Sequence, residues 1–449
     1  MAEVLFTGGR SISGSLMWPQ EAIWGSIKRD RPYDGHMNSR FRIPVASSMH
    51  IEDIGSAVRA VVLVHESLRT TFPTAGDGQS CHQRVHPSGR LEVLVTEMDQ
   101  LAIESFQETW GQRSFDTARG WPVRFAVVTA RGRAVALVGA ASHLVLDKFG
   151  ERALIRDIRS VLAGSAMRSG ERRITAVDRA RDESGSRLTA ISDRAVVRWR
   201  ELLGPNESRM FPTPLTGRGV LRSSSLVSPQ ATVDAKEIAT RLRVSSASVF
   251  MAATAVLVSS LSNRAAVVLQ SMLSNRFSPA EASFVGNLAQ AWGVRLNVGA
   301  RAFVEIASDA YTESLRSYTM SRYDPKSLLA LRRELRDCKG LDAPQWFDSF
   351  HNDTRSPELR TAPRRAAAER TLTDERTLSR HGSRLYVEIR EVRDCVEIFV
   401  IVNSQFVSPN DPQALAIAIE TLLGRVAGGH AGSAVAAMVS ALDGGGTSR

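Results

Sequence analysis

Two pairs of strand-like segments, one pair in each half of the chain, constrain its fold more than any other feature. In both pairs a short polar turn joins two apolar runs, a pattern typical of a β-hairpin. The first pair is Val123–Thr129 with Ala134–Ala141, and the second is Arg384–Val392 with Val396–Val402. A helical pattern follows each pair, and strands mixed with helices in both halves predict an α/β fold with two lobes.

A polar stretch marks the expected boundary between the lobes. Residues 164–193 are rich in Arg, Ser, Gly and Asp and contain few large apolar side chains, so we interpret them as a linker. The chain has 449 residues, which is enough for more than one hydrophobic core. We expect an N-terminal lobe at residues 1–175 and a C-terminal lobe at residues 176–449.

The charge balance bears on the kind of partner. The chain has 57 Lys and Arg against 47 Asp and Glu, a formal net charge of +10. The basic residues are scattered, interleaved with acids, and do not alternate with aromatic residues as in a base-stacking platform. This pattern argues against nucleic acid and favours a mildly basic surface that attracts acidic partners.

Cysteine usage and apolar segments predict a cytoplasmic protein. Cys81, Cys338 and Cys395 are far apart and form no CxxC pair, so neither a disulfide framework nor a zinc site is expected. The first residues lack the charged start and apolar core of a signal peptide. The longest apolar stretch, Ala134–Leu146, is too short to span a bilayer, and we expect no membrane segment.

The segment Ser142–Asp147 (SHLVLD) is the sharpest chemical feature of the sequence. His143 follows the second strand of the first pair, and strand exits are where α/β sheets place catalytic groups. An imidazole is also the side chain best suited to take a proton near neutral pH. On these residues alone, a purely structural role for His143 stays open.

Two metal-binding interpretations fail on spacing. His65 and Glu66 do not belong to an HExxH zinc motif, because Arg69 stands at the position of its second histidine. His143 and Asp147 have no third ligand nearby in the sequence. A GxxxxGK[ST] nucleotide-binding loop is missing as well. We therefore expect neither a metal site nor ATP-driven ligation by that route.

Six segments, in a fixed order from about Leu16 to Val426, add a resemblance to a known family. SHLVLD is similar to the HHxxxDG motif of the condensation domains of nonribosomal peptide synthetases. The other five segments, which resemble further motifs of these domains, are LMWPQEAIW (16–24), HESLRTTF (65–72), FDTARGWPVR (115–124), VRWRELLG (197–204) and SFVGNLAQAWGVR (283–295). Condensation domains share a superfamily with chloramphenicol acetyltransferase.

This resemblance implies a fold and a reaction. The fold would be two chloramphenicol acetyltransferase-like lobes that form a pseudo-dimer with a central tunnel. His143 would face the tunnel and accept, or at least position, the proton of an acceptor amine that attacks an acyl thioester. The donor would be tethered to the phosphopantetheine arm of an acyl or peptidyl carrier protein, and no tightly bound cofactor is expected.

The resemblance also assigns supporting residues and shows departures from the family pattern. Asp147 takes the place of a structural aspartate, and Arg276 is its expected ion-pair partner. Ser142 replaces the first histidine of the motif. Lys148 replaces the glycine after the aspartate, and it either narrows the tunnel or points to solvent. The candidates for lining the tunnel are Lys148, Gly150, Gln290 and Trp292.

The chain shows no carrier, adenylation or thioesterase segment, so the resemblance implies a free-standing condensation enzyme. We expect amide formation between a carrier-bound (amino)acyl donor, supplied in trans, and a small soluble amine, of which an aminosugar is one case. Two alternatives stay open. One is an ester-forming acyltransferase, and the other is a catalytically degenerate module that recruits pathway enzymes or carrier proteins, which Ser142 and Lys148 motivate.

Overall fold

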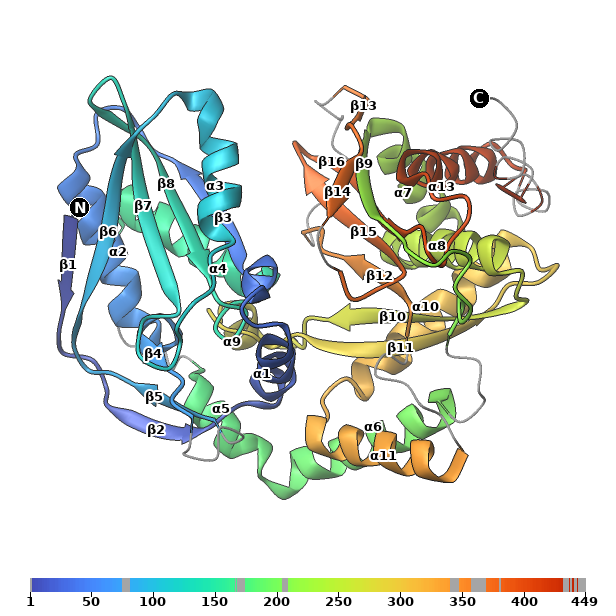
Figure 1. The fold of residues 1–449 in the computed structure, drawn as a ribbon, viewed down its shortest axis with the longest axis horizontal. Coiled ribbons are helices and arrows are strands. Elements are labelled where there is room, and N and C mark those ends of the chain that lie inside the picture. Colours follow the sequence, from blue (N-terminus) through green and yellow to red (C-terminus); the bar gives the residue numbers. More distant parts are fainter. Residues whose placement is uncertain are drawn as a thin grey trace. The chain divides into compact units, whose positions relative to one another are not determined.

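The computed structural model describes residues 2–74, 81–165, 174–203, 209–339, 347–356, 369–378 and 381–430, and the single positions 167, 436, 438, 439 and 442. The chain forms two compact units (Figure 1), each of which combines a β-sheet with helices. The first unit comprises Met1–Ser192, Ser274–Gln290 and Arg322–Pro325, and the second comprises Asp193–Leu273, Ala291–Ser321 and Lys326–Arg449. The α/β class is confirmed, and the assignment of lobes to 1–175 and 176–449 stays a prediction.

The first unit is built around a five-stranded sheet. In spatial order its strands are β1 (Ala2–Phe6), β6 (Gly89–Glu97), β7 (Val123–Ala130), β8 (Arg133–Ala141) and β3 (Ser39–Pro44). The pair β6 and β7 is parallel, and the other neighbours are antiparallel. A small second sheet consists of β2 (Ile12–Ser15), β5 (His82–Val85) and β4 (Thr70–Thr71).

Helices cover both faces of the five-stranded sheet. Successive residues of a strand point to opposite faces, so Phe125 and Val127 pack into one core cluster while Ala126 and Val128 pack into another. The first cluster includes side chains of two helices, α2 (Ile51–Val64) and α4 (Lys148–Leu162), and the second includes those of α3 (Ile103–Gly111). The remaining helices of this unit are α1 (Trp18–Asp30), α5 (Ala176–Glu183), the short α9 (Pro279–Ala282) and the 3-10 turns η1 (Asp34–Met37), η2 (Glu66–Arg69) and η3 (Gln100–Ala102).

The second unit contains an eight-stranded sheet. In spatial order seven of its strands are β11 (Gln290–Asn297), β10 (Ala266–Leu273), β12 (Ser349–Asp353), β15 (Leu385–Val392), β16 (Cys395–Asn403), β9 (Leu221–Ser228) and β13 (Thr371–Leu372), and β14 (Arg376–Leu378) also pairs with β9. Its helices are α7 (Pro229–Leu242), α8 (Ser246–Ser262), α10 (Phe303–Thr319), α11 (Pro325–Lys339) and α13 (Pro412–Ala427), together with the part of α6 (Ser186–Leu203) that follows Ser192. Helix α8 is buried along most of its length, which explains its nearly continuous apolar sequence.

Both hairpins predicted from the sequence are present. The two residues that connect β7 to β8, Arg131 and Gly132, have φ values of 52° and 70°. Arg393 and Asp394 connect β15 to β16 with φ values of 49° and 63°. Two consecutive residues with positive φ make a type I′ turn, whose twist matches that of the flanking strands. The same type of two-residue turn therefore closes the central hairpin in each unit.

The predicted linker over residues 164–193 is wrong in its second half. Helix α5 and the first residues of α6 occupy most of the positions from 176 onward. Small side chains mislead the prediction, because Ala176 and Ala180 are buried although they carry little apolar surface. Thr175 caps α5 by accepting a hydrogen bond from the backbone N–H of Asp178. Positions 166 and 168–173 of the predicted linker lie outside the described residues.

No single helix in the described ranges is both long and apolar enough to cross a membrane. Helices α7 and α8 meet that test only when they are taken together, and the pair is bent by 106°.

Candidate active site

The SHLVLD segment forms the loop between strand β8 and helix α4, as the sequence predicts. Ser142 continues the sheet by one hydrogen bond, from its N–H to the carbonyl of Pro122 (2.8 Å). The N–H of Val145 then donates to the carbonyl of Ser142 (3.0 Å), which turns the chain. Asp147 is the N-cap of α4 and accepts from the N–H of Gly150 (2.7 Å). His143 therefore lies between a fixed strand end and a capped helix start.

The carboxylate of Asp147 links this loop to a segment more than a hundred residues away. Its Oδ2 accepts from Nη1 of Arg276 (2.7 Å) and from the backbone N–H groups of Leu288 (2.7 Å) and Ala289 (3.1 Å). The side chains of Asp147 and Arg276 are each only 4% exposed. The ion pair expected between these two residues is thus present in the structure, and it is embedded in further hydrogen bonds.

Apart from its bond to Asp147, the guanidinium of Arg276 donates hydrogen bonds to carbonyl groups of the loop that contains Arg276. Nη1 also donates to the carbonyl of Ser274 (3.2 Å), and Nη2 donates to the carbonyls of Phe284 (3.3 Å) and Gly286 (3.0 Å). A buried ion pair gains stability when its remaining polar atoms find partners, and these carbonyls provide them for Nη1 and Nη2, while Nε is buried without a hydrogen-bond partner. Asp147 and Arg276 together therefore fix the path of residues 274–289 beneath the SHLVLD loop.

His143 is partly buried, and its Nδ1 is enclosed with no hydrogen-bond partner of ordinary geometry within the described ranges. Burial lowers the pKa of His143 below its usual value, and the positive charge of Lys148 acts in the same direction. The negative charges of Asp147 and Glu151 and the backbone of Leu146 oppose this shift without cancelling it. The imidazole is consequently neutral near pH 7, which is the form that can accept a proton.

Three side chains from three different elements hold the carbonyl groups of the loop. Asn287 donates to the carbonyl of His143 (2.7 Å), and Gln20 of α1 donates to that of Leu144 (3.2 Å). The hydroxyl of Ser39, in β3, donates to the carbonyl of Leu146 (3.3 Å). Gln20 lies in the first motif of the sequence analysis. Neither Asn287 nor Ser39 was predicted: Asn287 lies in the segment 283–295 but was not singled out there, and no pattern marks Ser39.

The positions where the sequence departs from the family pattern have distinct surroundings. Ser142 is buried, and its Oγ accepts from the N–H of Leu144 at 3.4 Å, which is long for a hydrogen bond. Lys148 is the first residue of α4, is about half exposed, and pairs with the buried Glu151 (2.6 Å). Gly150 lies against the backbone of Gly286, where a Cβ would come within 2.4 Å of the carbonyl oxygen.

Gln290 and Trp292 are both buried, and they lie in different units. Gln290 donates to the carbonyl of Tyr323 (2.8 Å) and so ties together two segments of the first unit. Trp292 belongs to the second unit, where its ring packs edge-on against Trp199 with 5.4 Å between centroids. Inside the first unit the structure therefore brings His143 together with Ser142, Asp147, Lys148, Gly150 and Arg276. The role of Gln290 and Trp292 in lining a tunnel stays a prediction.

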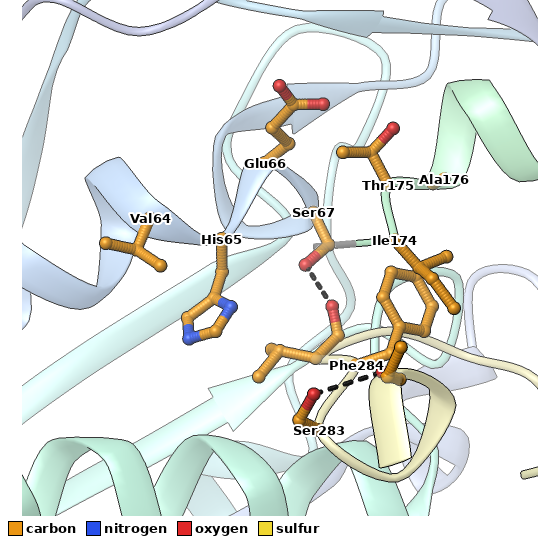
Figure 2. A pocket seen from close by; sticks show the side chains of 11 residues that line it. Val64, His65, Glu66, Ser67, Ile174, Thr175, Ala176, Ser283 and Phe284 are labelled. Atoms are coloured by element: carbon orange, nitrogen blue, oxygen red, sulfur yellow. Dashed lines mark hydrogen bonds between the residues drawn. The ribbon is translucent and has the colours of Figure 1, made fainter. Parts of the chain in front are cut away.

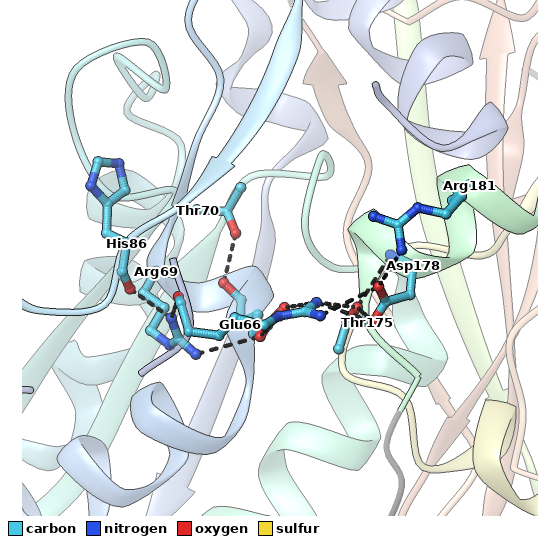
Figure 3. A network of polar contacts seen from close by, with 8 residues as sticks. Glu66, Arg69, Thr70, His86, Thr175, Asp178 and Arg181 are labelled. Carbon is cyan, nitrogen blue, oxygen red and sulfur yellow. Dashed lines mark hydrogen bonds and ion pairs between the residues drawn. The ribbon is translucent and has the colours of Figure 1, made fainter. Parts of the chain in front are cut away.

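A separate pocket of the first unit lies next to the loop that carries Asn287. It encloses about 360 Å³, part of it open to solvent, and His143 is not among its lining residues. Figure 2 shows one wall of the pocket, where the hydroxyl of Ser67 donates to the carbonyl of Val285 (2.6 Å). Arg10 bridges two other lining residues, Glu66 (3.0 Å) and Thr175 (2.9 Å), in the polar network of Figure 3. All of these polar groups have protein partners, so we assign no ligand to this pocket.

Metal ligands do not gather in the described part of the chain. No group of three or more His, Cys, Asp or Glu side chains is placed there to hold an ion.

The comparison with curated proteins identifies multidomain synthetases. No family model matches the chain. The chain is 27% identical over 327 residues to an isonitrile lipopeptide synthase of Mycobacterium tuberculosis, which covers 68% of this chain and 13% of that protein. It is 32% identical over 140 residues to a nonribosomal peptide synthetase of Aspergillus campestris, covering 30% of this chain and 1% of that protein. The chain thus spans only a small part of the length of these relatives.

Solved structures show the same fold over almost the whole chain. The condensation domain of the monacolin K polyketide synthase MokA superposes with a TM-score of 0.77 at 16% identity, covering 94% of this chain and 98% of that one. The starter condensation domain of rhizomide synthetase, solved with C8-CoA, superposes with a TM-score of 0.72 at 18% identity, covering 93% and 95%. The chain has the condensation-domain fold. The resemblance to the condensation domains of nonribosomal peptide synthetases, expected from the motifs, is confirmed.

Proposed function

We propose that this protein is a condensation-type acyltransferase that forms an amide bond between a carrier-bound acyl thioester and a small amine. The observation that carries the proposal is the position of His143, which follows strand β8 on a loop that the buried Asp147–Arg276 pair holds. Two structural neighbours support the proposal: one was solved in complex with C8-CoA, and another is described in the context of condensation domain-mediated chain release from the enacyloxin polyketide synthase.

The reaction follows from the chemistry of the two substrates. The amine nitrogen attacks the thioester carbonyl and forms a C–N bond, and the imidazole of His143 takes the proton that this nitrogen loses. The C–S bond then breaks, and the leaving thiolate takes the proton that the imidazole has accepted, which gives an amide and a thiol and returns His143 to its neutral form. General-base catalysis of this kind contributes on the order of 10²–10⁴-fold in rate.

The partners are part of the same proposal. The donor is an acyl or aminoacyl group on the phosphopantetheine arm of an acyl or peptidyl carrier protein, supplied in trans, and the acceptor is a small soluble amine such as an aminosugar. The net charge of +10 favours association with an acidic carrier. An alcohol acceptor would give an ester by the same proton transfer.

A product assay tests the proposal. Carrier proteins loaded with acyl and aminoacyl groups are incubated with a panel of amines and alcohols, and products are identified by mass spectrometry. We expect wild type to form amides and His143→Ala to be slower by 10²–10⁴-fold. His82→Ala removes an exposed histidine from β5 and should match wild type.

The other outcomes decide between the alternatives. Equal rates for wild type and His143→Ala would refute a catalytic role for His143. Ester products alone would favour the ester-forming alternative. Carrier binding without any product would favour the recruiting module, which the weakly bonded Ser142 and the Lys148–Glu151 pair motivate.

A further inference from the structure

The side chain of Asn287 forms a short hydrogen bond to the main chain of His143. The Nδ2 of Asn287 donates to the carbonyl oxygen of His143 at 2.7 Å. The Oδ1 of the same amide accepts from the backbone N–H of Ala289 at 3.0 Å. Because one end faces an acceptor and the other a donor, only one orientation of the amide satisfies both bonds. Asn287 is buried, so water does not compete for either group.

The other side-chain contacts to the main chain of residues 142–146 are longer and act on other residues. Ser142 reaches Leu144 N–H at 3.4 Å, and Gln20 reaches the carbonyl of Leu144 at 3.2 Å. Ser39 reaches the carbonyl of Leu146 at 3.3 Å. A hydrogen bond weakens as it lengthens, so among these side-chain bonds to main-chain groups of residues 142–146 the one from Asn287 is the strongest restraint, and it acts at the residue that carries the imidazole.

The backbone that carries Asn287 is itself held on both sides. The carbonyl of Gly286 accepts from Nη2 of Arg276 (3.0 Å), and the N–H of Leu288 donates to Asp147 (2.7 Å). The amide of Asn287 therefore projects from a rigid support toward His143. This arrangement is what a supporting side chain needs in order to hold a functional group in place.

We propose that Asn287 is a positioning residue for His143, which sets the direction of the imidazole by fixing the peptide that carries it. The inference rests on the proposed function for its effect on rate, but its structural part is independent of that function. Misplacing a catalytic group by about 1 Å can cost on the order of 10²-fold in rate. We therefore expect Asn287→Ala to lower kcat about 10- to 100-fold with little change in KM.

Two variants distinguish the effect of losing the Nδ2 donor of Asn287 from the effect of losing its Oδ1 acceptor. Asn287→Ala removes both bonds, whereas Asn287→Asp keeps the shape and the acceptor for Ala289 but loses the donor to His143. If the donor matters, both variants lower kcat to a similar degree. A wild-type kcat in Asn287→Asp would overturn the proposal.

The matched control is Asn38→Ala. Asn38 is another buried amide whose Nδ2 donates to main-chain carbonyls, those of Gly111 and Arg113 (both 2.9 Å). These two carbonyls lie outside the segment 142–147. Asn38→Ala should reproduce any general effect of losing a buried amide. An equal fall in kcat for Asn38→Ala and Asn287→Ala would show a merely structural role and would overturn the proposal.

A spectroscopic measurement makes the inference independent of catalysis. In protein labelled with ¹³C-histidine, the imidazole signal of His143 is assigned by its absence from His143→Ala. We expect this signal to shift in both Asn287 variants and to stay unchanged in Asn38→Ala. An unchanged His143 signal in the Asn287 variants would overturn the inference, whereas a shifted signal in a protein without condensation activity would support it and refute only the proposed function.

Discussion

The carboxylate of Asp147 forms four hydrogen bonds that join the SHLVLD loop to helix α4 and to residues 276–289. It caps α4 with Oδ1 and collects three donors on Oδ2, including the buried guanidinium of Arg276. The residues that depart from the family motif do not take part in these bonds, because Ser142 contacts Leu144 and Lys148 contacts Glu151. The hydrogen bonds that hold the loop therefore do not depend on the side chains of Ser142 and Lys148.

We expect Asp147→Ala to destabilise the folded protein before it affects the reaction itself. It leaves Arg276 charged and buried without a counter-ion, which costs about 3–5 kcal/mol of stability. Thermal unfolding and yield of soluble protein measure this loss. Adding Arg276→Met to Asp147→Ala removes the uncompensated charge and should recover part of it. Soluble Asp147→Ala protein that melts like wild type would contradict the structural role.

Packing of α4 against the loop that follows Ser283 depends on two glycines. A Cβ on Gly150 would lie 2.4 Å from the carbonyl oxygen of Gly286, and a Cβ on Gly286 would lie 2.0 Å from the ring of Phe284. The sequence shows both glycines but not their contact, since 136 positions separate them. The helix can approach the loop closely because Gly150 has no side chain, and Gly286 leaves room for the ring of Phe284 within the loop.

Gly150→Ala is expected to destabilise the protein by about 1–3 kcal/mol, because the added methyl group meets backbone that cannot move aside cheaply. Gly25→Ala is the matched control. Gly25 lies in α1 with nothing within 4 Å of an added Cβ, and alanine there should stabilise by about 0.5–1 kcal/mol. Urea unfolding compares the two variants, and equal effects of the same sign would count against the close-approach argument.

Elements that depend on local sequence were predictable, and those that depend on distant contacts were not. The hairpin closed by Arg393 and Asp394 follows from apolar runs around a two-residue turn. Helix α5 was missed because its buried residues are small, so its apolar periodicity is weak. Asn287 was missed because its partner, the carbonyl of His143, leaves no trace in the sequence around it.

The first unit as a whole is assembled from three separate stretches of chain, and buried charges join them. Glu183 of α5 accepts from the N–H of Trp18 at the start of α1 (2.7 Å) and pairs with Arg179 (3.5 Å). Glu281 of α9 then pairs with Arg179 (3.4 Å) and with Arg322. Helix α1 also carries Gln20, which contacts the SHLVLD loop, so this cluster connects the assembly of the unit to the candidate active site.

Glu183 should make the stability of this unit fall between about pH 4.5 and pH 7. Burial raises the pKa of Glu183 to about 7, so over this window the folded state binds more protons than the unfolded state, and stability decreases as pH rises. The contribution lost is about 3 kcal/mol. Glu183→Gln cannot titrate and should show a flatter dependence when urea midpoints are compared at pH 5 and pH 7.5. Parallel pH profiles for the two proteins would contradict the assignment.

The sequence by itself determined the α/β class, both central hairpins, the place of His143 at a strand exit and the order of motifs that indicates a condensation-domain fold. Each of these depends on side chains that are close in the sequence or on spacings that survive in a linear pattern. Only the tertiary structure decided what holds His143: the ion pair of Asp147 and Arg276, the contact of Gly150 with Gly286, and the amide of Asn287. These contacts join residues more than a hundred positions apart, and hydrogen bonds and close packing at such separations impose no local periodicity that a sequence could display.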